Sequence, residues 1–173
     1  MRRLILLRHM KSDRPKDTPD HERPLAERGR RTGPIIGAYM AQAGLLPDFA
    51  IVSTALRTQQ TWELVAPAFP AAVPAANESR VYEAPARQLL SVLREAPDDK
   101  RTVVLVGHNP GLEDLANMLI GTGASADLLL LREKYPTGGL AVVDFDISSW
   151  KDLAKSTGHL ERFVTPRSVE TPS

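Results

Sequence analysis

Short runs of apolar residues alternate along the chain with longer amphipathic segments. Three continuous apolar runs are typical of strands buried on both faces of a parallel sheet. They occupy residues 4–7, 49–52 and 103–106. Four other segments show helical spacing of apolar positions or are rich in alanine and leucine, and they end near glycine or proline. These are residues 26–43, 56–69, 87–95 and 110–120. The alternation predicts an α/β fold, a three-layer α/β/α arrangement with a mainly parallel central sheet.

The second half of the chain predicts two further strands, at residues 140–145 and 162–164. We expect them nearer a sheet edge, because Asp144 and Asp146 alternate with apolar residues. The charged segment 13–24 holds three prolines and is expected to form a loop over the strand ends.

One longer connection and a tail complete the pattern. Residues 122–134 are expected to form the connection, with the leucines of 128–131 in the core. Residues 165–173 contain two prolines and are expected to form a loosely held tail. A chain of 173 residues suffices for one well-packed core, so residues 1–173 are predicted to form a single domain.

Composition excludes several classes of function. The formal net charge is +1, with 22 basic and 21 acidic residues, which does not favour nucleic-acid binding. The absence of cysteine excludes disulfides, thiolate metal sites and cysteine nucleophiles. The first apolar run ends at Arg8, too early for a signal peptide, and no later run has the length of a membrane span. We expect a soluble, cytoplasmic protein; the sequence predicts no oligomeric state.

Two of the predicted strands end in a histidine. Arg8 and His9 follow the first run, and Gly107 and His108 follow the third. The carboxyl ends of parallel strands meet at the edge of the sheet where ligands bind. A guanidinium offers paired donors to phosphate oxygens, and an imidazole nitrogen is a nucleophile suited to phosphorus. The Arg8-His9 pair taken alone is better explained as the end of a strand in solvent.

A third candidate, Arg57, lies one turn into the helix that follows the second run. Ser53 or Thr54 is expected to cap this helix, which would aim free backbone amides at the same sheet edge. Asn109 is expected to cap the helix after His108. The other two histidines of the chain, His21 and His159, have no such setting, and His21 is expected to be solvated in its loop.

Four motifs, in this order along the chain, resemble the histidine phosphatase superfamily, also called phosphoglycerate mutase-like. They are Leu7-Arg8-His9, Arg23-Pro24-Leu25, Ser53 with Arg57, Gln60 and Thr61, and Val106-Gly107-His108-Asn109-Pro110. The short chain is similar to the SixA-type phosphohistidine phosphatases within that superfamily.

The resemblance implies roles for the matching residues. His9 would be phosphorylated during turnover, and Arg8, Arg57 and His108 would bind the phosphoryl oxygens, without a metal or other cofactor. Ser12 and Asn109 would add phosphate contacts.

The sequence also departs from the family pattern. Met10 stands where many relatives have glycine, Pro15 where mutase-like members have asparagine, and Thr54 where proline is usual. Mutase activity and a sugar-phosphate pocket are therefore not implied.

A proton donor for the leaving group is the least defined part of the site. Glu83 lies where mutase-like relatives place a carboxylic acid, although it fits equally an exposed loop carboxylate. Asp13 and Asp17 are alternatives in the first loop. An imidazole, with a pKa of about 6.5, leaves with little help from an acid.

The short connections favour an open site, which would admit a phosphorylated histidine on a protein surface. The lack of a well-defined proton donor also favours phosphohistidine as the substrate. Two alternatives stay open: a broad phosphatase of small phosphomonoesters that uses the same residues, and a noncatalytic phosphopeptide-binding module. Retention of both His9 and His108 argues against the binding module, because binding alone needs only arginines and amides.

Overall fold

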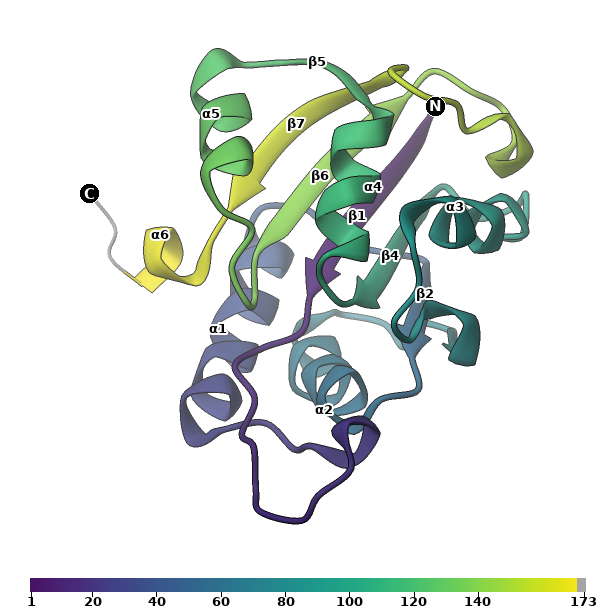
Figure 1. Cartoon of the computed structure of the whole chain (residues 1–173). Coiled ribbons are helices and arrows are strands. Elements are labelled where there is room, and N and C mark those ends of the chain that lie inside the picture. The colour runs from purple at the N-terminus through teal and green to yellow at the C-terminus, as the bar shows by residue number, and fades with distance from the viewer. Residues whose placement is uncertain (171–173) are drawn as a thin grey trace.

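A seven-stranded sheet forms the centre of the computed structural model, which describes residues 1–170 (Figure 1). Its order is β3-β2-β4-β1-β6-β7-β5. The strands are β1 (Arg2–Arg8), β2 (Phe49–Ser53), β3 (Ala75–Glu78), β4 (Thr102–Gly107), β5 (Ile120–Gly123), β6 (Leu140–Phe145) and β7 (Gly158–Val164). The helices are α1 (Glu27–Gln42), α2 (Leu56–Val65), α3 (Ala86–Arg94), α4 (Gly111–Leu119), α5 (Ser125–Glu133) and α6 (Pro166–Glu170).

Parallel pairing dominates the sheet. Strand β4 pairs in parallel with β1 and β2, β2 with β3, and β5 with β7. Only β6 runs antiparallel to its neighbours, β1 and β7. The predicted mainly parallel sheet is confirmed.

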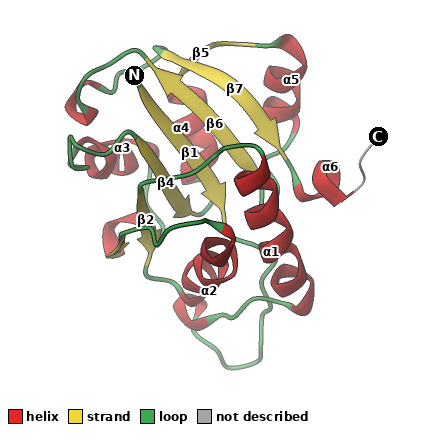
Figure 2. Ribbon diagram, turned by 180° about the vertical axis from the view of Figure 1, so that it is seen from behind, coloured by secondary structure: helices red, strands yellow, loops and turns green. Residues whose placement is uncertain are grey.

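Helices cover both faces of the sheet, because the side chains of the central strands are buried on both. In β1, Leu4 and Leu6 face one way and pack with residues of α3 and α4. Ile5 and Leu7 face the other way and pack with residues of α1 and α2. Figure 1 shows α3 and α4 in front of the sheet, and Figure 2 shows α1 and α2 from behind. The three-layer arrangement is confirmed.

Strands 140–145 and 162–164 were both expected nearer a sheet edge. This was wrong for the first, which is β6, whereas the second belongs to β7, next to the edge strand β5. β6 is hydrogen-bonded on both sides, and the edges of the sheet are β3 and β5. Asp144 is accommodated on this inner strand because Arg3 of β1 donates to its carboxylate at 2.7 and 2.9 Å. The polar position that had suggested an edge is therefore explained by an ion pair between two adjacent inner strands.

The segment expected to be one long connection is structured. It contains the second half of β5 and the whole of α5. Among the leucines expected in the core, Leu131 is buried, whereas Leu129 is 65% exposed and Leu130 is 48% exposed. α5 buries little because it covers the margin of the sheet, beside β7 (Figure 1).

The expected loose tail is in part a helix. Residues Pro166–Glu170 form α6, which lies beside α1, and Val169 packs against the core on that face. Proline suits the first position of a helix, so Pro166 is compatible with a helix here. Residues 171–173 of the predicted tail lie outside the described residues. Among residues 1–170, no helix combines the length and the apolar character needed to cross a bilayer.

Candidate active site

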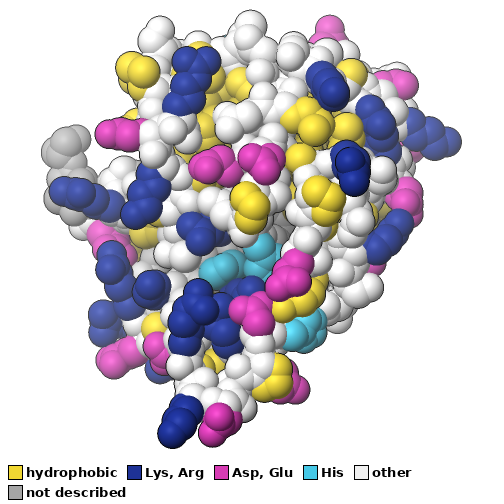
Figure 3. Space-filling view, viewed as in Figure 1, with side chains coloured by type: hydrophobic (Ala, Val, Ile, Leu, Met, Phe, Trp, Pro, Cys, Tyr) yellow, Lys and Arg dark blue, Asp and Glu magenta, His cyan; other side chains and the backbone are white. Residues whose placement is uncertain are grey.

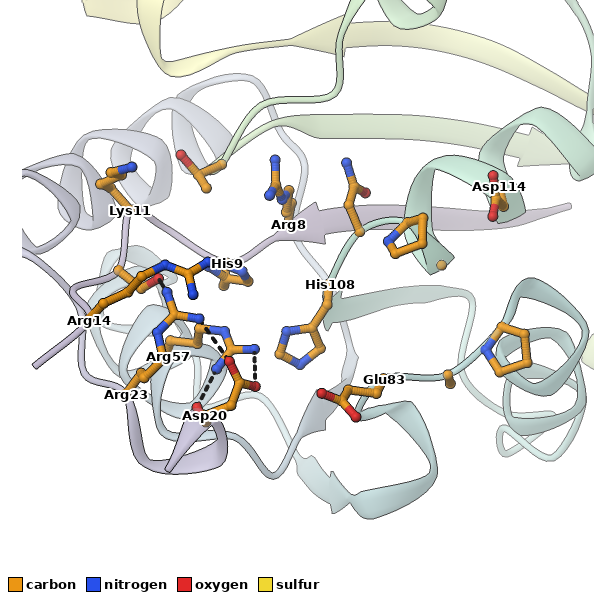
Figure 4. Close-up of a pocket in the computed structure, with 17 residues that line it drawn as sticks. Arg8, His9, Lys11, Arg14, Asp20, Arg23, Arg57, Glu83, His108 and Asp114 are labelled. Atoms are coloured by element: carbon orange, nitrogen blue, oxygen red, sulfur yellow. Dashed lines mark hydrogen bonds and ion pairs between the residues drawn. The ribbon is translucent and has the colours of Figure 1, made fainter. Parts of the chain in front are cut away.

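Side chains from three strand ends meet in one pocket at the carboxyl edge of the sheet. The pocket has a volume of about 680 Å³, and its lining includes Arg8, His9, Arg57 and His108. Figure 3 shows histidine side chains in a hollow of the surface, with Lys and Arg side chains gathered beside them. Figure 4 shows the four side chains together: β1 ends at Arg8, His108 follows β4, and Arg57 lies on α2, just after β2. We refer to this cavity as the strand-end pocket.

The imidazole of His9 is held in one tautomer by the adjacent backbone. Its Nδ1 lies 2.7 Å from the carbonyl oxygen of Met10, which can only accept, so Nδ1 carries the proton and Nε2 keeps its lone pair. Burial lowers the pKa of His9 to about 4, and the positive charges of Arg57 and Arg8 act in the same direction. At neutral pH, His9 is therefore an uncharged imidazole with a nucleophilic Nε2.

His108 completes a pair of neutral histidines. The centroids of the His9 and His108 rings are 5.3 Å apart. The Nε2 of His108 is hydrogen-bonded to Ser53 Oγ at 2.7 Å, and its Nδ1 is buried without a partner. Burial lowers the pKa of His108 to about 3, with His9 and Arg57 adding to the effect.

The strand-end pocket concentrates buried polar atoms that have no partner. Four side-chain nitrogens of this kind occur among the described residues, and three belong to the pocket. They are Nε of Arg8, Nε of Arg57 and Nδ1 of His108. Buried donors without acceptors are costly, and phosphoryl oxygens are strong acceptors for guanidinium groups. The pocket therefore has the composition of a binding site for a compact oxyanion.

Asp20, which nothing in the sequence distinguishes from its neighbours, is hydrogen-bonded to two arginines of the pocket. Its carboxylate accepts from Arg57 at 3.1 Å, from Arg23 at 2.9 Å and from the Tyr82 hydroxyl at 2.5 Å. The Tyr82 hydrogen bond, followed by those of the two arginines, holds the pKa of Asp20 far below its usual range. Asp20 is thus an anion at neutral pH, and any anion that entered the pocket would have to compete with it for Arg57.

Glu83 lies where the sequence predicts the proton donor, at the mouth of the pocket. It lines the cavity, and Figure 4 shows its side chain near His108. Its φ of 51° lies in the left-handed region, which is strained for a glutamate, and such strain is concentrated at functional sites. Asp13 and Asp17, the alternatives in the first loop, do not line the pocket.

Two predicted phosphate contacts lie at the pocket but are already engaged. The hydroxyl of Ser12 accepts from Arg23 at 2.7 Å. The amide of Asn109 donates to the Tyr135 carbonyl at 3.0 Å and accepts from the backbone of Glu113 at 3.2 Å. Asn109 thus bonds within the first turn of α4, which begins at Gly111 rather than at Pro110.

Predictions for the start of α2 and for His21 were wrong. Neither Ser53 nor Thr54 caps α2, whose N-cap residue is Ala55 without a side-chain hydrogen bond. Ser53 instead bonds His108, and Thr54 Oγ1 lies 2.9 Å from Nε2 of His21. His21 also packs edge-on against Tyr82, so it is held by two side-chain contacts and is not a freely solvated loop histidine.

Two tertiary contacts fix the position of the Arg8-His9 segment. The Thr61 hydroxyl of α2 accepts from the Met10 amide at 2.9 Å and donates to the Arg57 carbonyl at 2.8 Å. The Gly138 amide donates to the His9 carbonyl at 2.9 Å. Gly138 has a φ of +73°, and a Cβ there would lie 2.9 Å from the Met10 sulfur, so only glycine fits.

Comparison with known proteins shows which family the chain belongs to. No model of a known protein family matches the chain. An uncharacterized protein of Mycobacterium tuberculosis is 32% identical over 163 residues, which is 93% of this chain and 100% of that protein. The crystal structure of an Agrobacterium tumefaciens protein, provisionally named phosphohistidine phosphatase SixA, is 30% identical with a TM-score of 0.79. It covers 95% of this chain and 99% of that one.

The chain belongs to the histidine phosphatase superfamily. A second SixA structure, from Nakamurella multipartitia and named with the same provisional status, is 27% identical with a TM-score of 0.80 and covers 95% of this chain and 96% of its own. These matches confirm the predicted phosphoglycerate mutase-like fold and the resemblance to SixA-type proteins. The assignment of individual residues to catalytic roles stays a prediction, developed below.

The three side chains at which this histidine phosphatase departs from the family pattern do not line the strand-end pocket. Met10 is fully buried in the core and contributes its backbone carbonyl, not its side chain, to His9. Pro15 is exposed and does not line the pocket. Thr54 bonds His21 behind the pocket. Among residues 1–170, no group of three or more histidine, aspartate or glutamate side chains is placed to hold a metal ion.

The two buried histidines of this histidine phosphatase predict a loss of stability in weak acid. Their pKa values of about 4 and 3 lie below the value of about 6.5 expected in the unfolded chain. Between about pH 6.5 and 4 the unfolded chain binds protons that the folded protein does not, so the free energy of unfolding falls as the pH falls. Urea denaturation at pH 7.0, 6.0, 5.0 and 4.5 measures this slope.

A matched pair of variants separates the two histidines from the other titrating groups. The double variant His9→Gln and His108→Gln should lose clearly less stability between pH 7.0 and 4.5 than the wild type. A double variant of the remaining histidines, His21→Gln and His159→Gln, serves as the control. Equal pH slopes in the wild type and the first variant would show that the buried pair does not cause the loss.

Proposed function

We propose that this protein is a phosphatase that transfers a phosphoryl group from its substrate to Nε2 of His9 and then to water. The observation that carries the proposal is the tautomer of His9: the Met10 carbonyl holds the Nδ1 proton, which leaves Nε2 with a lone pair in a pocket lined by Arg8 and Arg57. A noncatalytic binding module would need the arginines but not an oriented, neutral imidazole.

The proposed reaction has two displacements. In the first, the Nε2 lone pair attacks phosphorus and the bond to the leaving group breaks, with its electron pair passing to the leaving atom. In the second, water attacks the phosphohistidine, loses a proton to solvent, and the electrons of the P–N bond return to Nε2 of His9. Arg8, Arg57 and His108 would stabilise the charge on the phosphoryl oxygens in both transition states. The products are free His9 and inorganic phosphate.

We propose that no metal ion takes part. Metal ions in phosphoryl transfer neutralise the charge of the phosphoryl oxygens and orient them. Here, two largely buried guanidinium groups would supply both functions, because the Nε atoms of Arg8 and Arg57 lie buried without partners.

We propose phosphohistidine in a protein as the substrate. A sugar or serine phosphate releases an alkoxide that must be protonated, and the most enclosed carboxylate of the pocket, Asp20, is held ionised by Arg23, Arg57 and Tyr82. The remaining candidate, Glu83, is exposed at the rim. A departing imidazole needs far less assistance, since its pKa is about 6.5.

Turnover by the Glu83→Gln variant tests the substrate assignment. Hydrolysis of sugar phosphates should be slow in the wild type and should fall by about 10²-fold further if Glu83 serves as their acid, whereas hydrolysis of a phosphohistidine protein should change less than about threefold. The matched control is Asp114→Asn, which removes another carboxylate that lines the pocket. A wild-type preference for the sugar phosphates would establish the small-molecule phosphatase instead, and an absence of turnover on every substrate would favour the binding module.

A further inference from the structure

A second cavity adjoins the strand-end pocket and shares part of its wall. It has a volume of about 730 Å³, and three residues line both cavities: Arg8, Lys11 and Thr137. We call it the basic groove, defined by four exposed cationic side chains, in addition to the shared Arg8, and by a partly apolar lining. The exposed cations are Lys11, Arg28, Lys134 and Arg167, and the accessible apolar lining includes Leu130 and Pro166.

The four cations of the basic groove are unpaired within the described residues. No ion pair joins Lys11, Arg28, Lys134 or Arg167 to a carboxylate of residues 1–170, and Glu133 is the one carboxylate from that part of the chain that lines the groove. Elsewhere exposed arginines do form ion pairs, as Arg80 does with Glu95 at 2.7 Å. In a chain of net charge +1, this groove is a local positive field.

The cations of the groove differ from those of the strand-end pocket. Lys11, Arg28, Lys134 and Arg167 are all exposed, and they come from different places in the chain: the loop after β1, α1, the end of α5, and α6. A site built for one phosphate has buried, converging donors, as Arg57 and His108 provide in the pocket. Exposed cations around a rim suit several carboxylates along a chain.

The apolar part of the groove points to a polypeptide. Leu130 lines it and is 48% exposed, and the half-buried Pro166 lines it as well. An apolar surface beside unpaired cations matches a peptide that carries both acidic and apolar side chains. A small phosphorylated metabolite would leave these side chains uncovered.

We propose that the basic groove binds an acidic segment of the phosphoprotein substrate, adjacent in that protein to the phosphohistidine held in the strand-end pocket. The inference rests on the proposed function. Because Arg8, Lys11 and Thr137 line both cavities, one continuous chain can occupy the two together. Figure 3 shows the Lys and Arg side chains gathered on the side of the histidines toward α1 and α6.

Two phosphohistidine peptides test the groove, one flanked by glutamates and one by glutamines, with free phosphohistidine as a third substrate. The wild type should hydrolyse the glutamate peptide with a kcat/KM about tenfold higher at low salt, and 1 M NaCl should remove the difference. The double variant Lys134→Glu and Arg167→Glu should lose this preference while hydrolysis of free phosphohistidine stays unchanged.

The control is a double variant with the same change of charge at the other end of the sheet. Arg101→Glu and Lys151→Glu alter exposed residues close to the amino end of β4, and the preference should survive. The proposal is overturned if the groove variant keeps the preference, or if both variants lose it equally. It is also overturned if the groove variant hydrolyses a small bisphosphate ester more slowly than the wild type but hydrolyses both peptides at the wild-type rate.

Binding of the unphosphorylated glutamate peptide, measured by calorimetry, separates this proposal from the proposed function. Should no phosphohistidine be hydrolysed, the phosphatase proposal fails, and the groove is still tested by this binding. The expected result is affinity about tenfold weaker in the Lys134→Glu and Arg167→Glu variant than in the wild type. Equal affinities would overturn the groove alone.

Discussion

His9→Ala should reduce kcat on a phosphohistidine substrate by on the order of 10⁴-fold or more, because it removes the atom that forms the covalent intermediate. The Met10 carbonyl and the side chains of Arg8, Arg57 and His108 stay in place in this variant, so inorganic phosphate should still bind. Steady-state kinetics together with phosphate binding by calorimetry measure the two effects separately.

His159→Ala is the matched control for this variant. His159 is exposed on β7, where it bonds Thr122 at 2.8 Å, and its removal should leave kcat unchanged. The urea midpoint of His9→Ala at pH 7 should stay close to that of the wild type. A similar midpoint would show that the loss of activity is not caused by unfolding. Retention of more than a few per cent of wild-type activity by folded His9→Ala would mean that another group attacks phosphorus.

Arg57→Ala has the second-largest expected effect, a loss of about 10²- to 10³-fold in kcat. Arg57 is 5% exposed, so its charge should act on the phosphoryl group with little screening by water. Arg57→Lys keeps the charge but loses the paired donors, and it should recover only part of the loss. Arg31→Ala, on the exposed face of α1, should leave turnover unaffected.

A purely structural role for Arg57 is separable from a role in catalysis. Arg57 donates both to the backbone and to the carboxylate of Asp20, at 2.7 and 3.1 Å, so its removal also frees that loop. If holding Asp20 were its only function, Asp20→Ala would lose as much activity as Arg57→Ala. We expect Asp20→Ala to lose much less, because it leaves the guanidinium available to the phosphoryl oxygens.

The core of the fold and the centre of the site were predictable because they depend on local pattern. Continuous apolar runs identified β1, β2 and β4, whose side chains are buried on both faces. In parallel strands the carboxyl ends share an edge, which was enough to bring His9, His108 and Arg57 together. The edge strands β3 and β5 escaped prediction because they are short and half exposed, and carry no continuous apolar run.

Features that depend on the path of a loop were not predictable. Nothing local distinguishes Asp20 from its charged neighbours in the segment 13–24, and its role follows only from tertiary contacts with Arg57 and Tyr82. The same holds for His21, which bonds Thr54 from a distant part of the sequence. The inner position of β6 likewise depended on a partner for Asp144 on another strand.

Trapping the intermediate tests the central claim, that His9 carries the phosphoryl group, most directly. Wild-type protein mixed with a ³²P-labelled phosphohistidine protein and denatured at alkaline pH should carry protein-bound phosphate that is stable to base and released by acid. Peptide mapping should place that phosphate on His9, and His9→Ala should carry none. Turnover without a trapped phosphate on His9, or the same label in His9→Ala, would contradict the account.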